Sequence, residues 1–167
     1  MRKITAIIFT ACAAFALGAC NKEQAANPEA EAKPQVAPVP TNPTDKTAWK
    51  QYLVSVVTAN MQGVKTNHPY MYFVPGGDDD AAKADRQNQL DNVKNVVARG
   101  VLPGNMMAFG GPESKTTADL IVAAFADASA GSFKDVIVLF IGAPGDLDAV
   151  KQALASSGAE VRFVEAK

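Results

Sequence analysis

Histidine and cysteine are scarce in this chain of 167 residues, which has one histidine and two cysteines. The cysteines, Cys12 and Cys20, lie in the first twenty residues, and the histidine, His68, precedes a predicted strand. A hydrolase with a Ser-His or Cys-His pair needs an imidazole beside its nucleophile. No G-x-S-x-G motif and no zinc-type His/Cys spacing occurs either. These absences speak against nucleophilic and zinc-dependent catalysis.

Clustered positive charge is also missing, because 16 basic residues stand against 17 acidic ones, for a net charge of -1. A nucleic-acid-binding domain would concentrate Lys and Arg on a strongly basic surface. The composition is otherwise that of an ordinary globular protein, with 48% hydrophobic and 20% charged residues. We therefore expect a folded domain that does not bind nucleic acid.

The N-terminus lacks an apolar run long enough to span a bilayer, which takes roughly 20 residues. Instead, Arg2 and Lys3 precede the uncharged residues 4–16, and small residues follow. This is the layout of a secretory signal peptide. The end of the segment, Leu17-Gly18-Ala19-Cys20, resembles the lipobox of bacterial lipoproteins.

The resemblance implies that residues 1–19 are removed and that Cys20 becomes the acylated first residue of the mature protein. Several acyl chains hold a protein stably on a bilayer, whereas one chain does so only marginally. Asn21 follows Cys20, and a residue other than aspartate at this position resembles lipoproteins that are sent to the outer membrane. The alternative is an ordinary signal peptidase site that leaves Cys20 as a free thiol. In either case no cysteine remains in the folded region to form a disulfide.

Residues 20–45 contain no aromatic residue and five of the ten prolines. Such a segment buries too little apolar surface to offset its ordering entropy, so we expect an extended, mobile linker. The alternative, a proline-rich ligand for a partner, would need a recognisable core motif, and none is present. The folded part is then predicted to be a single domain over residues 46–167.

Residues 46–167 alternate between helical and strand patterns. Helices are predicted after Asp45 or Thr47, after residues 78–80 up to Gly100, from the Ser114, Thr116 and Thr117 caps to Gly131, and between Asp146 and Gly158. Strands are predicted at 70–74, 105–109, 136–141 and 161–164, the third fully apolar and therefore central.

This αβαβαβαβ order predicts a small layered α/β domain, Rossmann-like or flavodoxin-like, with a mostly parallel four-stranded sheet. Right-handed crossovers favour a strand order of 2-1-3-4.

In such sheets ligands bind beyond the carboxyl ends of the strands, where the strand order reverses. Three loops are expected there, at residues 75–80, 110–117 and 142–146. Glycine-rich turns and helix caps account for most of their residues without any ligand. The candidate ligand- or partner-binding residues are Gly76, Gly77, Asp78, Asp79, Asp80, Gly110, Gly111, Ser114, Lys115, Thr116 and Asp146.

Two sharper hypotheses concern these loops. Lys115, hydroxyls and a helix N-terminus could cradle an anion, although Ser114 stands where a P-loop needs glycine. Asp78, Asp79 and Asp146 could hold a hard divalent cation through their carboxylates.

Two function classes are left open. The first is a membrane-anchored lipoprotein that displays a non-catalytic binding or accessory α/β domain, without a cofactor, on the periplasmic side of the cell envelope. Its expected partners are the lipid bilayer, through acylated Cys20, and an envelope protein. The alternative is a metal- or phosphate-dependent enzyme that uses the loop carboxylates with a divalent cation.

Overall fold

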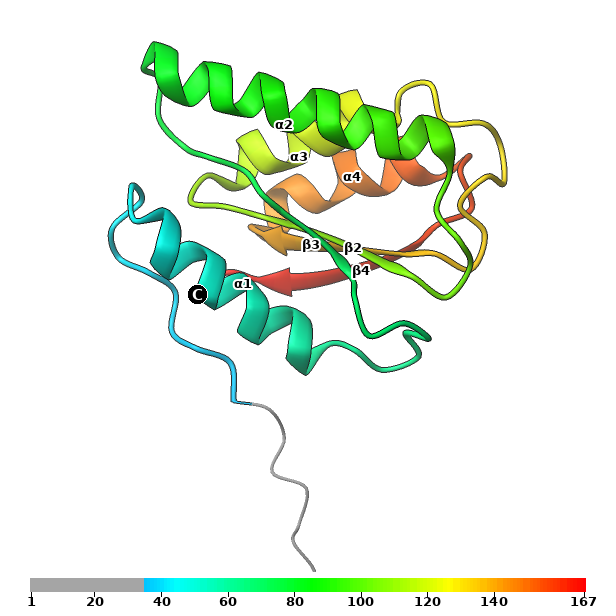
Figure 1. The fold of residues 1–167 in the computed structure, drawn as a ribbon, viewed down its shortest axis with the longest axis horizontal. Helices are drawn as coiled ribbons and strands as arrows, with labels where there is room; N and C mark the ends of the chain where they lie inside the picture. The colour runs from blue at the N-terminus through cyan, green and yellow to red at the C-terminus, as the bar shows by residue number, and fades with distance from the viewer. Residues whose placement is uncertain (1–34) are drawn as a thin grey trace, which may run out of the picture. The chain divides into compact units, whose positions relative to one another are not determined.

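The computed structural model describes residues 35–167, so the predicted signal peptide, Cys20 and most of the predicted linker lie outside the described residues. The described part is an α/β domain with one sheet (Figure 1). In chain order its elements are α1 (Lys46–Ala59), β1 (Tyr70–Phe73), α2 (Asp80–Arg99), β2 (Met106–Gly110), α3 (Ser114–Phe125), β3 (Ile137–Gly142), the 3-10 turn η1 (Pro144–Asp146), α4 (Leu147–Leu154) and β4 (Glu160–Glu165).

The sheet is entirely parallel and its strand order is β1-β2-β3-β4. The predicted α/β class with a parallel four-stranded sheet is confirmed, but the predicted order 2-1-3-4 is wrong. Each crossover moves one strand further in the same direction, so right-handed connections place α2, α3 and α4 on one face of the sheet. The helix that precedes β1, α1, covers the other face (Figure 1).

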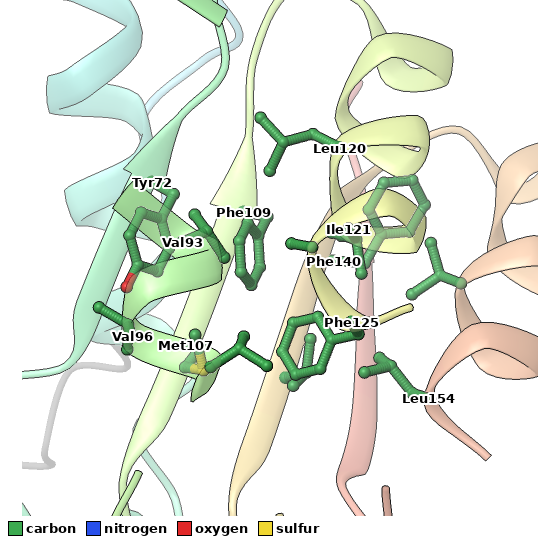
Figure 2. Close-up of a cluster of buried hydrophobic side chains, with 14 of the residues drawn as sticks. Tyr72, Val93, Val96, Met107, Phe109, Leu120, Ile121, Phe125, Phe140 and Leu154 are labelled. Atoms are coloured by element: carbon green, nitrogen blue, oxygen red, sulfur yellow. The ribbon is translucent and has the colours of Figure 1, made fainter. Parts of the chain in front are cut away.

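The face under α2, α3 and α4 carries a row of aromatic side chains that crosses all four strands. Tyr72 of β1 is in register with Phe109, Phe109 with Phe140, and Phe140 with Phe163. The rings of Tyr72 and Phe109 stack with centroids 4.8 Å apart (Figure 2). Because Val93 of α2 is fully buried against this row, the helices and the sheet share one core.

The opposite face is covered by α1 together with shorter segments. Trp49, Leu53 and Val56 of α1 are buried against β2 and β3. The helix starts as predicted, with the Asp45 carboxylate accepting hydrogen bonds from the first free N–H groups.

Residues 35–45 belong to this layer rather than to a mobile linker. The Ala37 N–H donates to Ser55 Oγ at 2.9 Å, Val39 packs on the same cluster, and Trp49 Nε1 donates to the Asn42 carbonyl at 3.1 Å. The packed domain therefore begins before the predicted boundary at residue 46.

The end of one helix agrees with the sequence prediction, and the end of another does not. Gly100, at φ 79°, ends α2 as expected, because glycine adopts this left-handed conformation without strain. The helix α3 stops at Phe125, well before the predicted end at Gly131. Within residues 35–167 no helix is both long enough and apolar enough to cross a membrane.

Candidate functional site

The three loops at the carboxyl ends of β1, β2 and β3 do lie together, and Glu113 joins the first two. One of its carboxylate oxygens accepts from the Gly77 N–H at 2.7 Å, and the other accepts from Thr116 Oγ1 at 2.9 Å. These two hydrogen bonds, with the charge of Arg86, hold the pKa of Glu113 below its ordinary value. Arg86 also donates to the carbonyls of Pro75 and Gly77. The backbone of the first loop is therefore held by hydrogen bonds with both Glu113 and Arg86.

Ser114 joins the second loop to the third. Its hydroxyl donates to Asp146 Oδ2 at 2.5 Å and accepts from the Ala143 N–H at 2.6 Å. Asp146, predicted to cap the last helix, makes no capping hydrogen bond with its side chain. Lys115, predicted to attract an anion, forms an exposed ion pair with Asp119 one turn along α3, at 2.6 Å.

The acidic residues 78–80 lie at the start of α2, and two of them stabilise its N-terminal end. Asp79 is its N-cap and accepts from the Ala82 N–H at 2.9 Å, which lowers the pKa of Asp79. Asp80 lies in the first turn, where a negative charge favours the helix dipole, and Asp78 is exposed. In residues 35–167 no group of three Asp, Glu, His or Cys side chains is placed to hold a metal ion. The structure therefore does not gather Asp78, Asp79 and Asp146 into the predicted cation site.

The loop glycines serve close packing of the backbone. A Cβ on Gly111 would lie 2.0 Å from the Val74 carbonyl oxygen, and one on Gly76 would lie 2.8 Å from Glu113 Oε1. At Gly110, the last residue of β2, a Cβ would meet Leu53 at 2.5 Å. These glycines therefore let neighbouring segments approach each other, whereas Gly77, at φ 93°, has the left-handed turn conformation that the structural interpretation predicts.

The strand order also removes the crevice expected at this edge. A switch point needs neighbouring crossovers that run in opposite directions, and the order β1-β2-β3-β4 has none. What remains is a hollow of about 370 Å³ between the loops and the segment around Pro40. The exposed His68 precedes β1, at the opposite end of the strand from these loops.

A larger groove of about 680 Å³ runs along the open edge of β1, between α1 and α2. Strand β1 forms the floor, with Met71 and Phe73. The wall formed by α1 is apolar at one end and basic at the other, with Leu53, Val54, Lys46 and Lys50. The wall formed by α2 is polar, with Asp85, Asn88, Gln89 and Asn92.

One ion pair crosses this groove. Lys46 Nζ of α1 lies 2.6 Å from Asp85 Oδ2 of α2, and both side chains are about half exposed. A smaller hollow of about 150 Å³, lined by Pro43 and Gly76, continues beyond the pair towards the loops. Lys46 and Asp85 line both spaces. The groove therefore extends along β1 up to the loop edge, with the ion pair as a bridge over it.

The sequence patterns do not predict this groove, although the composition of β1 points to an accessible edge strand. Both outer strands have one unpaired side, but β4 carries Glu160, Arg162 and Glu165, whereas β1 has no charged residue. Charges on an edge strand protect it from pairing with other chains. Tyr70 and Met71 are 41% and 45% exposed, so β1 is an open and unprotected edge.

Comparison of the chain with protein-family models, with curated proteins and with solved structures gives no match. A functional assignment therefore depends on the residues and their geometry.

Proposed function

We propose that this protein is a lipid-anchored binding module of the bacterial cell envelope. Acyl chains on Cys20 hold it on the outer membrane, and its α/β domain faces the periplasm and binds another envelope protein without catalysing a reaction. The anchoring part follows from the basic residues, the apolar segment and the lipobox-like Leu17-Gly18-Ala19-Cys20 at the N-terminus.

The observation that carries the binding part is the groove at β1. It combines apolar surface with polar walls, as protein-binding sites do, and it opens on unpaired backbone of an edge strand. The polar groups at the loop edge, by contrast, are engaged with one another. Glu113 and Ser114 satisfy backbone N–H groups, and Asp146 accepts from Ser114. This arrangement favours the binding module over an enzyme that uses the loop carboxylates.

The anchoring part is tested by the mature N-terminus in cells. Wild-type protein should fractionate with outer membranes, and mass spectrometry should find acyl chains on Cys20. Cys20→Ala should be unprocessed or unacylated. An acylated mature chain from Cys20→Ala would contradict the proposal.

The binding part is tested by photocrosslinking in living cells. A benzophenone amino acid at Val54, which is 47% exposed in the groove, should give a discrete crosslinked protein. The matched control is the same probe at Leu102, which is 77% exposed and does not line the groove. Additional probes at Lys115 and Val122 report on the loop edge and on α3. If probes at Val54, Lys115 and Val122 all fail to crosslink to a protein, the binding function is contradicted.

A further inference from the structure

We infer that the groove along β1 is a strand-addition site, and that its occupant is an extended peptide segment of another protein with acidic groups and alternating apolar side chains. This inference rests on the proposed function, because it specifies how the binding module recognises its partner. Peptides that add to the edge of a sheet bind through main-chain hydrogen bonds, and pockets for alternate side chains give specificity.

The backbone of β1 presents the required groups. The Val74 N–H donates to the Gly110 carbonyl at 2.9 Å, so it points towards β2. Backbone groups of successive residues in a strand point to opposite sides. The backbone N–H and C=O groups of Tyr72 therefore also point towards β2, whereas those of Met71 and Phe73 point towards the open edge. An added strand would satisfy these four groups.

The two walls select the side chains of such a segment. Residues of an added strand alternate between the walls. On the α1 side they meet Leu53, Val54 and the exposed side chain of Met71, which favour aliphatic groups. On the α2 side they meet the amides of Asn88, Gln89 and Asn92, which favour hydrogen-bonding side chains.

Charge complementarity makes the segment acidic. Lys46 and Lys50 lie one helical turn apart on the same wall. Lys46 pairs with Asp85, but among residues 35–167 Lys50 forms no ion pair. A carboxylate on the bound segment would supply that partner and could compete for Lys46, since an exposed ion pair is weak.

The helices on either side of the groove favour a peptide over a second copy of the chain as its occupant. In a symmetric dimer β1 would have to pair with β1 of the other copy, and α1 and α2 of each copy stand beside that strand. Both pairs of helices would then have to fit around the same two strands. A single extended segment has no such walls and fits the groove.

The test uses the mature chain from residue 20 with Cys20→Ser, which keeps it in solution without acyl chains. The probe is a six-residue peptide with a glutamate at each end and alternating valine and threonine between them. Amide hydrogen exchange is followed by NMR with and without peptide. We expect exchange of the Met71 and Phe73 amides to slow by about tenfold or more at saturation, whereas Tyr72 and Val74, already bonded to β2, change little.

Two control peptides isolate the recognition chemistry. A peptide N-methylated at alternate residues keeps its side chains but loses the donors that pair with β1, and it should not protect Met71 or Phe73. A peptide with lysine in place of both glutamates should bind at least about tenfold more weakly. Binding of the N-methylated peptide with equal affinity would overturn strand addition.

Two variants and one matched control complete the test. Met71→Lys places a charge on the edge strand and should abolish protection, whereas the matched Leu102→Lys, away from the groove, should not. Lys50→Glu alters an exposed residue and should reverse the preference, so that the lysine peptide binds better than the glutamate peptide.

Besides equal binding of the N-methylated peptide, three results would overturn the inference. The first is no protection of Met71 and Phe73 at millimolar glutamate peptide. The second is protection of Phe73 that survives Met71→Lys, or a Lys50→Glu protein that still binds the glutamate peptide better than the lysine peptide. The third is protection that grows with protein concentration in the absence of peptide, which would identify a second copy as the occupant. A crosslink in cells from Lys115 or Val122 but not from Val54 would leave the proposed binding function standing while this inference fails.

Discussion

The hydroxyl of Tyr72 is a buried polar group for which the described part of the chain offers no hydrogen-bond partner. The side chain is 4% exposed, and its ring stacks on Phe109 with an interplanar angle of 19° (Figure 2). A buried hydroxyl without a partner costs about 1–3 kcal/mol, and the ring packing does not depend on it. Tyr72→Phe should therefore raise the free energy of unfolding by about 1 kcal/mol, and Tm by about 3–5 °C.

Urea and thermal unfolding of wild type and variant measure this effect. The matched control is Tyr70→Phe, on the same strand but 41% exposed, which should change the free energy of unfolding by less than about 0.5 kcal/mol. A destabilisation of Tyr72→Phe by about 1 kcal/mol or more would refute the reasoning, because it would show that the hydroxyl makes a favourable bond in the folded protein.

The same side chain gives a pH dependence. Burial, with a smaller contribution from Tyr70, raises the pKa of Tyr72 from 10.0 to about 12. The folded state then keeps the proton while the unfolded state loses it, so stability falls as the pH rises from about 10 to about 12. The difference corresponds to about 2–3 kcal/mol. Tyr72→Phe should lack this loss and retain only the smaller one from Tyr52, whose pKa burial also raises.

Three further predictions concern the packed loops and the N-terminal segment. Glu113→Gln should remove a loss of stability that wild type shows as the pH falls below 4.5, because the lowered pKa of Glu113 favours folding only while the carboxylate is ionised; urea midpoints between about pH 6 and pH 3 measure it. Gly111→Ala should destabilise by about 2 kcal/mol or more in urea unfolding, since its Cβ meets the Val74 carbonyl, whereas Gly145→Ala, with nothing within 4 Å, should be neutral. Deleting residues 20–41 should lower the free energy of unfolding in urea by about 1–2 kcal/mol, because the contacts of Ala37 and Val39 are lost with the deleted segment. An unchanged urea midpoint would show that this segment contributes nothing.

Local sequence patterns predicted the elements of this fold well because the physics of each element is local. The six apolar residues 136–141 predicted a strand covered on both faces, and all six residues of β3 are buried. Asp45 as the start of α1 and Gly100 as the end of α2 follow from capping chemistry within a few residues.

Features that depend on distant contacts were not predictable in the same way. The strand order is decided by which strands pair, and several orders satisfy right-handed crossovers. Asp146 is predicted to cap α4, but its carboxylate accepts a hydrogen bond from Ser114, which follows a different strand. The loop cluster could be predicted because carboxyl ends of parallel strands share an edge. The groove could not, because its walls come from α1 and α2, whose Lys46 and Asp85 are far apart in sequence.

The strand order and the groove have a common physical origin. Because every crossover moves in one direction, three helices cover one face of the sheet and only α1 remains for the other. One helix is about 10 Å wide, whereas the outermost axes of four strands about 4.8 Å apart are about 14 Å from each other. The remaining area is filled by Val39, Met61, Val64 and Ala166 from irregular segments. Next to the open edge of the first strand, Val54 and Met71 stay half exposed. The edge of β1 therefore stays accessible beside this single helix, and the proposed strand addition depends on that accessibility.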